Sequence, residues 1–351
     1  MPLVGKANRA IATLEGLFYG LPNPGVLLSP MTTQEAVLSS KIEGTQADFE
    51  DVLKFEAGEK PTEISRREDI DEIMNYRRAL RLSEDLLKDR PFCLGSLLKL
   101  HEVLMDSVRG HDKGRGRFRT IQNWIGRPGC SLEEATFVPP SPLLLQDHLN
   151  RWEAYWHSDT PDVLVQLALI HAQFEVLHPF LDGNGRLGRM VIPLFLYEKK
   201  ILSHPCFYLS AFFETRRVDY IDRLRDLGQP GSWTRWVAFF LEGVAVQAEA
   251  NTRKAREIQD LYERLKRRCL ELTHSQFAVP LLDYMFKRPI FRSSDLTRLE
   301  HMPSAPMVAN LLGNLRRNGI LHTVREAAGS RPHVLALAEL INLCEGRKVI
   351  Q

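Results

Sequence analysis

The 351-residue sequence contains no apolar run long enough to cross a lipid bilayer. The nearest candidate, Val191–Tyr197, is short and is interrupted by a proline. The first residues, MPLVGKANRAIATLEG, also lack the continuous apolar core of a secretory signal. We therefore expect a soluble, cytoplasmic protein without a membrane partner.

Cysteine is scarce, and internal repeats and low-complexity segments are absent from the sequence. The five cysteines are odd in number and far apart, and none forms a CxxC pair: Cys93, Cys130, Cys206, Cys269 and Cys344. This pattern argues against a disulfide framework or a zinc site and favours reduced thiols. Hydrophobic residues make up 44% and charged residues 26% of the chain, as in globular proteins. The length predicts two or three domains.

The net charge is only +2, but the charge is unevenly distributed. Residues 252–351 hold 17 lysines and arginines against 10 acidic residues, whereas residues 1–251 hold 29 against 34. This asymmetry indicates either a C-terminal module that meets an acidic partner, such as nucleic acid, or a single solvated helix face.

Helical periodicity dominates the middle of the chain. Apolar residues recur at helical spacing in three segments: 70–87, 94–108 and 145–156. The pair Thr160–Pro161 is typical of an N-cap followed by the first residue of a helix, and Pro179 is expected to end that helix. A further helix is expected over about 185–199, with a kink at Pro193. By contrast, residues 119–125 and 135–138 flank a turn rich in glycine and proline, which predicts a small β-hairpin.

The C-terminal segment predicts a different kind of module. We expect three short helices and then two strands around a turn at Ala328–Ser330; in order, they cover 277–286, a start at Ser294, a start at Ser304, 319–324 and 334–337. Three helices and a hairpin are typical of a winged helix-turn-helix domain. In the third helix Arg316 and Arg317 stand at the end, whereas DNA readout uses the start of a recognition helix. This favours contact with protein over binding of nucleic acid.

The chemistry is concentrated in the sequence HPFLDGNGRLGR, from His178 to Arg189. A histidine at the C-terminal end of a helix can accept a proton near neutral pH. The Gly-Asn-Gly turn leads into a helix whose free N–H groups and dipole form an anion site. Its glycines let phosphate oxygens approach the backbone closely.

Two arginines and one carboxylate complete this pattern. Arg186 and Arg189 are three residues apart, so they lie on one helix face and can bind further phosphates. A single carboxylate beside phosphates, here Asp182, is a ligand for Mg²⁺. The segment therefore predicts phosphoryl or nucleotidyl transfer from a nucleoside triphosphate.

The segment resembles the signature of the Fic family, HPFx[D/E]GNGRxxR, at every position. The resemblance implies transfer of AMP from ATP to a Ser, Thr or Tyr hydroxyl of a target protein, or of the enzyme itself. His178 would be the general base, and Asp182 would hold Mg²⁺. The implied ATP contacts are Gly183, Asn184, Gly185, Arg186, Leu187, Gly188 and Arg189, with Tyr220 near the adenine.

A second motif, Ser39–Gly44, resembles the inhibitory segment of the family, [S/T]xxxE[G/N]. Helical spacing places Ser39 and Glu43 on one side of a helix turn, directly before Gly44. The resemblance implies that Glu43 pairs with Arg189 and blocks productive ATP binding, as in the N-terminally inhibited members.

The predicted hairpin resembles the flap of the family, which receives the target backbone by strand addition. Its residues are Ile121, Asn123 and Trp124, with Phe137–Pro140 opposite. The lone histidines lack metal-ligand spacing and are expected to be packed or surface groups, not ligands: His101, His148 and His171.

The expected fold is mainly α: a Fic-type helical core with a β-hairpin flap, and a C-terminal winged helix-turn-helix domain. The expected parts are an N-terminal helical region with the inhibitory motif (1–90), the catalytic core (91–250), a helical linker (251–274) and the winged-helix-like domain (275–351). ATP and Mg²⁺ are the expected cofactors. Two alternatives stay open: removal of AMP from modified targets, with Glu43 orienting a water, and a DNA-binding regulator that senses nucleotide. The donor nucleotide, the target and a homodimer also stay open.

Overall fold

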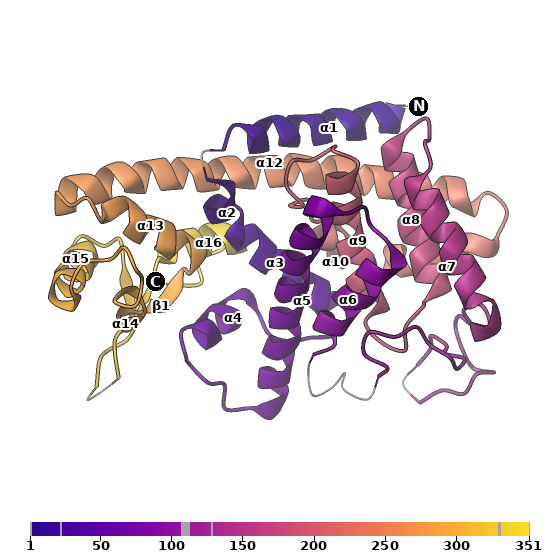
Figure 1. Cartoon of the computed structure of the whole chain (residues 1–351), viewed down its shortest axis with the longest axis horizontal. Coiled ribbons are helices and arrows are strands. Elements are labelled where there is room, and N and C mark those ends of the chain that lie inside the picture. The colour runs from indigo at the N-terminus through magenta and orange to yellow at the C-terminus, as the bar shows by residue number, and fades with distance from the viewer. Residues whose placement is uncertain (1, 22, 107–112, 128, 329–330, 351) are drawn as a thin grey trace. The chain divides into compact units, whose positions relative to one another are not determined.

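The computed structural model describes residues 2–21, 23–106, 113–127, 129–328 and 331–350. This part of the chain is mainly α-helical, as predicted, with one small antiparallel sheet (Figure 1). It divides into two compact units, each assembled from separate segments. Unit 1 comprises Met1–Phe18, Leu38–Thr45 and Asp71–Asn251, and unit 2 comprises Tyr19–Val37, Gln46–Ile70 and Thr252–Gln351. The functional divisions expected at residues 90, 250 and 274 stay a prediction.

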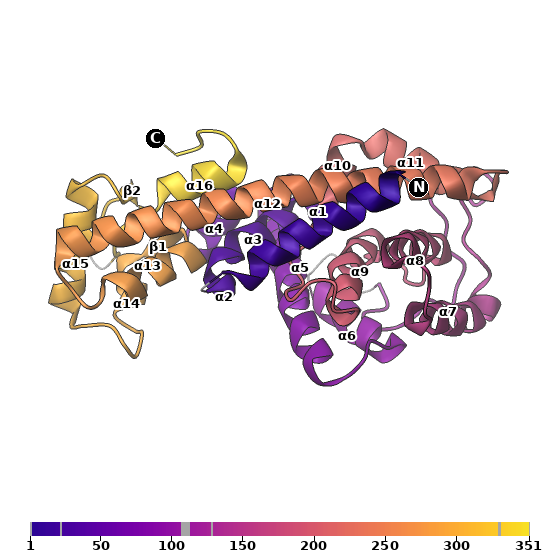
Figure 2. The ribbon, with the colours of Figure 1, turned by 90° about the horizontal axis from the view of Figure 1, so that it is seen from above.

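Unit 1 is a helical body. It contains, in whole or in part, α1 (Pro2–Tyr19), α3 (Ser29–Ile42), α5 (Ile64–Asp89), α6 (Leu94–Leu104), α7 (Pro142–His157), α8 (Val163–Leu177), α9 (Asn184–Glu198), α10 (Ser210–Thr215), α11 (Arg217–Arg225), the 3₁₀ helix η2 (Asp226–Gly228) and α12 (Ser232–Thr273). The predicted helices at 70–87 and 145–156 lie within α5 and α7. The predicted helix at 94–108 ends as α6 at Leu104, and its last expected residue, Val108, lies outside the described residues. The long helix α12, best seen in Figure 2, has residues in both units.

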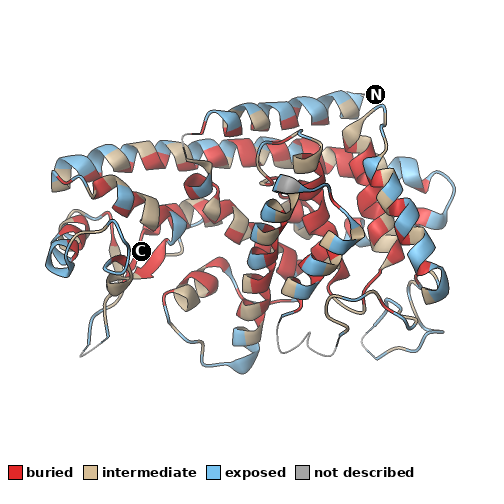
Figure 3. Ribbon diagram, viewed as in Figure 1, coloured by how far each residue is buried: buried red, intermediate tan, exposed pale blue. Residues whose placement is uncertain are grey.

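Helices α8 and α9 form the centre of unit 1, with α7 packed against α8. Both central helices are buried along most of their length, as Figure 3 shows, because apolar residues occur on all of their faces. The observed bounds of α9 confirm the helix predicted over about 185–199, and the helix continues through Pro193.

The start of α8 differs from the prediction. Asp162, and not Thr160, is the N-cap, and its carboxylate accepts a hydrogen bond from the Val165 N–H at 2.9 Å. The Thr160 hydroxyl donates instead to the side-chain oxygen of Gln166 at 3.1 Å. A carboxylate two residues further on therefore caps the helix and also matches the positive end of its dipole.

The predicted hairpin is reduced to one antiparallel bridge, between Ile125 and Phe137. The Ile125 N–H donates to the Phe137 carbonyl at 2.8 Å, and the Phe137 N–H donates back at 3.0 Å. The other end of the first segment is bonded elsewhere, since the Arg119 N–H donates to the Pro179 carbonyl at 2.9 Å. The two segments therefore pair as predicted, but over a single bridge and not over two full strands.

Unit 2 contains the sheet. It comprises, in whole or in part, α2 (Pro24–Leu27), α3, α4 (Phe49–Glu56), α5, α12, α13 (Ala278–Lys287), β1 (Ile290–Arg292), α14 (Ser293–Leu296), α15 (Ala305–Arg317), β2 (His322–Arg325), β3 (Val334–Ala336) and α16 (Ala338–Glu345). The strand order is β1-β3-β2, with Leu335 of β3 opposite Phe291 on one side and Thr323 on the other. The three helices and two strands expected here are present, and β1 was not predicted. The assignment as a winged helix stays a prediction, and part of its expected turn, at 329–330, lies outside the described residues.

Two further findings concern the cysteines and the apolar helices of the described residues. All five cysteines are free, as their spacing predicted. No described helix combines the length and the apolarity that a bilayer crossing needs.

Candidate active site

The turn between α8 and α9 carries His178, which caps the C-terminus of α8. Its backbone is left-handed, with φ of 45° and ψ of 59°, and its N–H donates to the Phe174 carbonyl at 3.0 Å. Non-glycine residues rarely adopt this conformation, which costs energy and persists only where the surroundings enforce it.

The loop between Arg119 and Asn123 supplies this enforcement. The Arg119 guanidinium donates to the carbonyls of His178 at 2.9 Å and of Pro140 at 2.6 Å. The Asn123 amide donates to the Phe180 carbonyl at 2.9 Å. These side chains hold the backbone at the histidine and after it, so Asn123 is turned toward the histidine loop.

Asn184 closes the loop from within. Its side-chain oxygen accepts from the Phe180 N–H at 2.9 Å, and its amide nitrogen donates to the Phe180 carbonyl at 2.8 Å. The first hydrogen bond of α9 runs from the Leu187 N–H to the Gly183 carbonyl. The backbone N–H groups of the three residues between them therefore have no carbonyl one turn earlier, and helix N-termini of this kind can bind an anion.

Asp182 stands at the entrance to this helix with a side chain that is 45% exposed. Its Oδ1 accepts from the Gly183 N–H at 2.5 Å. His101 links this loop to Gly116. Its Nδ1 accepts from the Gly116 N–H at 2.9 Å, and its Nε2 lies 3.1 Å from the Asp182 carbonyl. Burial lowers the pKa of His101 to about 4, so this histidine stays neutral and donates through Nε2 to the carbonyl.

The described residues contain no cluster of three or more histidine, cysteine or acidic side chains that would hold a metal ion unaided. A single accessible carboxylate beside an anion site nevertheless suits Mg²⁺, which takes one or two carboxylates and completes its shell with phosphate oxygens and water. Asp182 therefore fits the predicted role, provided that a phosphate ligand is also present.

Arg186 is buried and is held by acidic groups on two sides. Its Nη1 donates to Oε2 of Glu72, on α5, at 3.2 Å, and its Nη2 lies 3.6 Å from Oδ1 of Asp182. The Glu72 side chain is 12% exposed. Two carboxylates thus lie beside one guanidinium in the first turn of α9, so the positive charge of Arg186 is balanced by acidic groups there.

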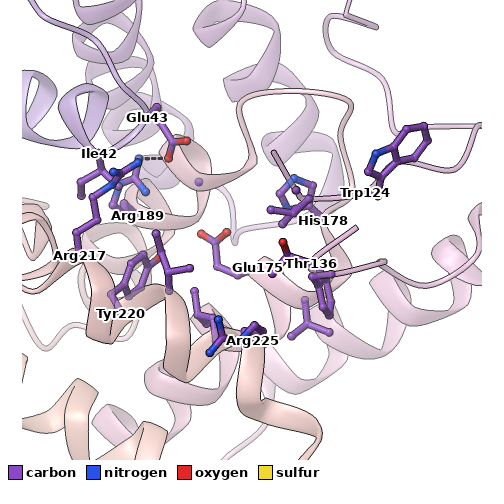
Figure 4. A pocket seen from close by; sticks show the side chains of 17 residues that line it. Ile42, Glu43, Trp124, Thr136, Glu175, His178, Arg189, Arg217, Tyr220 and Arg225 are labelled. Atoms are coloured by element: carbon purple, nitrogen blue, oxygen red, sulfur yellow. Dashed lines mark hydrogen bonds and ion pairs between the residues drawn. The ribbon is translucent and has the colours of Figure 1, made fainter. Parts of the chain in front are cut away.

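Arg189, one turn further along α9, binds the motif at Ser39–Gly44. Its Nη2 donates to Oε1 of Glu43 at 2.7 Å, and the dashed line in Figure 4 marks this contact. Ser39 accepts two more hydrogen bonds from the same guanidinium, one on its hydroxyl and one on its carbonyl, each at 2.8 Å. The predicted Glu43–Arg189 contact is therefore confirmed.

This ion pair shifts the pKa of both of its partners. Burial alone would raise the pKa of Glu43, but the charge and the hydrogen bond of Arg189 outweigh it and lower that pKa. Burial alone would lower the pKa of Arg189, but Glu43 and then Tyr220 raise it above its ordinary value. The pair is thus ionised at neutral pH.

Gly185 is the point where this pair meets the anion site. A Cβ atom added to Gly185 would lie 2.2 Å from Oε1 of Glu43 and 3.1 Å from Nη1 of Arg189. The absence of a side chain lets the carboxylate of Glu43 rest against the first turn of α9. The same space admits a phosphate oxygen when Glu43 is elsewhere.

A pocket opens beside these groups, and His178, Arg189, Glu175 and Tyr220 are among its lining residues (Figure 4). Trp124, Ile125 and Gly126 also line this pocket. Burial is the largest cause that lowers the pKa of His178 to about 4, and its Nδ1 is enclosed without a hydrogen-bond partner. A neutral imidazole with a ring nitrogen still unused is the form that can accept a proton.

Some of the predicted ligands are not available to a nucleotide. Leu187 is fully buried and its N–H is already bonded, so we drop it from the phosphate site. The Asn184 side chain is likewise engaged by the loop, which leaves only its backbone N–H. Tyr220 lines the pocket but is 4% exposed, and its hydroxyl lies 3.0 Å from Nε2 of His171. In the flap, Ile121 and Trp124 are 61% and 41% exposed, so both remain accessible to a partner.

Three residues that the sequence analysis did not select belong to this site. Arg119 and Glu72 position His178 and Arg186, and no local pattern could have paired residues so far apart in sequence. Glu175 had a detectable signal, because it precedes His178 by three residues and therefore lies on about the same face of α8.

Two family models match the chain. The model described as Fic/DOC family N-terminal matches residues 1–85, and the model described as Fic/DOC family matches residues 62–196. Together they extend over more than half of the sequence and include both motifs.

Curated relatives and solved structures agree with this match. A probable protein adenylyltransferase of Aquifex aeolicus is 39% identical over 94 residues, which is 26% of this chain and 27% of the relative. The protein adenylyltransferase Fic of Nematostella vectensis is 25% identical over 126 residues, which is 34% of this chain and 27% of the relative. The chain thus matches about a quarter of the length of these relatives.

The similarity of fold extends further than the similarity of sequence. A Fic family protein from Desulfovibrio desulfuricans G20 has a TM-score of 0.59 and 19% identity, with 96% of both chains covered. Fic-1 from C. elegans has a TM-score of 0.56 and 21% identity, with 74% of both chains covered. At this level of identity the structures show a shared fold.

Proposed function

Because this chain belongs to the Fic/DOC family, we propose that it is a protein adenylyltransferase, which transfers AMP from ATP to a hydroxyl group of a target protein. The observation that carries the proposal is the position of His178. Its neutral imidazole lines the same pocket as Gly185 and Arg189, which belong to the first turns of α9. A proton acceptor and an anion site therefore face one cavity.

His178 acts on the incoming hydroxyl group. The imidazole takes the proton as the hydroxyl oxygen forms a bond to the α-phosphorus of ATP. The bond from that phosphorus to the bridging oxygen breaks, and pyrophosphate leaves. Positioned general bases contribute about 10²–10⁴-fold to such reactions.

The first turn of α9 binds the phosphates. The unpaired backbone N–H groups after Gly183 and the helix dipole stabilise negative charge on the α- and β-phosphates. Arg186, in the first turn of α9, contacts the phosphates with its guanidinium. Arg189 can bind the γ-phosphate once Glu43 releases it. Mg²⁺ held by Asp182 and phosphate oxygens would supply positive charge to the leaving pyrophosphate.

Glu43 is the inhibitory residue in this proposal. Its carboxylate occupies the space beside Gly185 and engages Arg189, so it competes for both with the terminal phosphate. A charge-assisted hydrogen bond of this type contributes about 1.5–3 kcal/mol. The lower end of that range applies here, since the Glu43 side chain is 41% exposed and water screens the pair.

A second activity, removal of AMP from a modified target, is supported by the same exposed carboxylate. Glu43 lines the pocket with His178, so it can orient a water molecule toward the phosphorus of a bound AMP group. The attacking oxygen then comes from water, whose proton passes to the neutral imidazole of His178. That proton is delivered to the target oxygen as its bond to phosphorus breaks, so AMP and the free hydroxyl are the products.

The test is incubation of the protein with α-labelled ATP and Mg²⁺, with label followed on the protein itself and on added lysate proteins. We expect label on protein, a higher level in Glu43→Gly, and none in His178→Ala. Absence of label from every variant, while ATP still binds, would reject the transferase. Release of AMP from a labelled target by the unaltered chain, and its loss in Glu43→Gly, would support the second activity.

A further inference from the structure

Glu175 is an acidic group in the pocket for which AMP transfer, as proposed above, provides no role. It lies on α8, one turn before His178, and its carboxyl group points toward the interior of the pocket (Figure 4). Its Oε1 is enclosed and has no hydrogen-bond partner. A Cβ atom added to Gly188 would lie 2.2 Å from this oxygen, so the carboxyl group rests directly against the backbone of α9.

The hydrogen bonds that the structure shows for Arg189 and Tyr220, the neighbours of this carboxyl group in the pocket, go to other groups. Arg189 commits Nε and Nη2 to Ser39 and Glu43. The Tyr220 hydroxyl lies 3.0 Å from Nε2 of His171, whose other ring nitrogen must donate to the Gly188 carbonyl, 2.9 Å away. The Tyr220 hydroxyl therefore donates to His171 and not to the carboxyl group. A buried acceptor without a donor is costly, which makes such a group a candidate for ligand recognition.

The chemistry of a nucleoside triphosphate restricts what Glu175 can contact. Phosphate oxygens carry negative charge and accept hydrogen bonds, so a carboxyl group neither attracts them nor needs them. The nucleoside part carries donors, namely the ribose hydroxyls and the exocyclic amine of adenine. The wall near Glu175 includes Ile221 and Leu224 of α11, and apolar side chains of this kind suit a base and a sugar.

We infer that Glu175 determines nucleotide specificity, because its carboxyl group accepts a hydrogen bond from an amino or hydroxyl group on the nucleoside part of the bound nucleotide. This inference rests on the proposed use of ATP. Burial raises the pKa of Glu175 to about 7, and the carboxyl group keeps an acceptor oxygen in either protonation state.

The test measures binding without turnover by titration calorimetry, in the full chain with Mg²⁺. The chain carries His178→Ala to prevent transfer and Glu43→Gly to open the phosphate site. The ligands are ATP, 2′-deoxy-ATP, 3′-deoxy-ATP, inosine triphosphate and tripolyphosphate. The two deoxy analogues lack the 2′- and the 3′-hydroxyl group of the ribose, and inosine triphosphate lacks the exocyclic amine of adenine. Tripolyphosphate lacks the whole nucleoside. We expect one analogue to bind about ten- to hundredfold more weakly than ATP, as for loss of a hydrogen bond to a charged group.

Two variants at position 175 then separate recognition from simple packing. Glu175→Ala is expected to weaken the binding of ATP by that same factor. It should also bind ATP and the analogue that Glu175 disfavours with equal affinity. Glu175→Gln keeps a carbonyl acceptor of the same shape, so it should retain most of the affinity for ATP. Neither variant should alter binding of tripolyphosphate. Thermal unfolding of both variants verifies that they fold.

The outcomes distinguish this inference from the proposed function. Equal effects of Glu175→Ala on ATP and on tripolyphosphate would overturn the inference, as would unchanged binding of ATP. If ATP does not bind to the chain that carries both His178→Ala and Glu43→Gly, both proposals fail. If ATP binding depends on Glu175 as described, but protein with an intact His178 transfers no AMP, the proposed function fails and the inference stands.

Discussion

Ser39 and Arg189 are joined by two hydrogen bonds, because Nε of the arginine donates to the serine hydroxyl and Nη2 donates to the serine carbonyl, both at 2.8 Å. Ser39 is fully buried in this position. The pair ties the end of α3 to α9, so Glu43 is presented to the same guanidinium from a fixed backbone. The ionic contact thus depends on a second, largely unexposed contact that water does not screen.

Removing the carboxylate of Glu43 should release Arg189. We expect Glu43→Gly to raise the initial rate of AMP incorporation by about tenfold, in line with one charge-assisted hydrogen bond of about 1.5 kcal/mol. Arg189→Ala in that background should cancel the gain, because both changes act through one contact. The matched control is Lys41→Ala. Lys41 lies in the same segment as Glu43, and its 3.2 Å ion pair with Glu214 is broken, but the rate should stay unchanged. An equal rise in the control would show that loosening of the segment, and not the carboxylate, is responsible.

The hydroxyl of Ser39 should contribute a smaller part of the inhibition. Ser39→Ala removes one of the two hydrogen bonds to Arg189 and leaves the carbonyl contact and Glu43 in place. We expect a rise in incorporation of about threefold, below that of Glu43→Gly. Ser40→Ala is the control, since Ser40 is also buried but its hydroxyl has no hydrogen-bond partner. A larger effect at Ser40 than at Ser39 would contradict this role.

The pH dependence of transfer should reflect the lowered pKa of His178. A base acts in its neutral form, and burial keeps this imidazole neutral down to about pH 4. Lowering the pH from 7 to 5.5 should therefore reduce kcat/KM of Glu43→Gly by less than twofold, whereas an imidazole of ordinary pKa would lose about eightfold. The measurement is initial rates at several ATP concentrations across this range. An acid limb centred near pH 6.5 would mean that the base is exposed or is a different group.

Breaking the buried pair of Glu72 and Arg186 should destabilise the fold. Glu72→Ala leaves the Arg186 side chain, which is only 6% exposed, without this partner. Asp182, 3.6 Å away, is then its remaining acidic neighbour. We expect the free energy of unfolding to fall by about 3 kcal/mol, as for other buried pairs that lose one partner. Urea denaturation gives this value. Glu242→Ala, which breaks the exposed pair with Arg216, should cause little change, and similar losses in both variants would argue against a special role for Glu72.

The sequence alone determined the local parts of the site. The stretch from His178 to Arg189 contains a helix end, a turn and a helix start in contiguous residues, and each depends mainly on its own neighbours. The bounds of α9 and the free amides in its first turn were therefore predictable. The resemblance of Ser39–Gly44 to a known motif supplied the one long-range contact that was predicted correctly, that of Glu43 with Arg189.

Only the tertiary structure decided which distant groups meet. Glu72 reaches Arg186 across 114 positions in sequence, and Arg119 reaches His178 across 59, so no periodicity could reveal either contact. The predicted hairpin is limited to one bridge for the same reason, because Arg119 at the start of its first segment is bonded to the histidine loop and not across a ladder. Secondary structure follows from neighbours along the chain, whereas the protonation, burial and pairing of a site depend on side chains that only folding brings together.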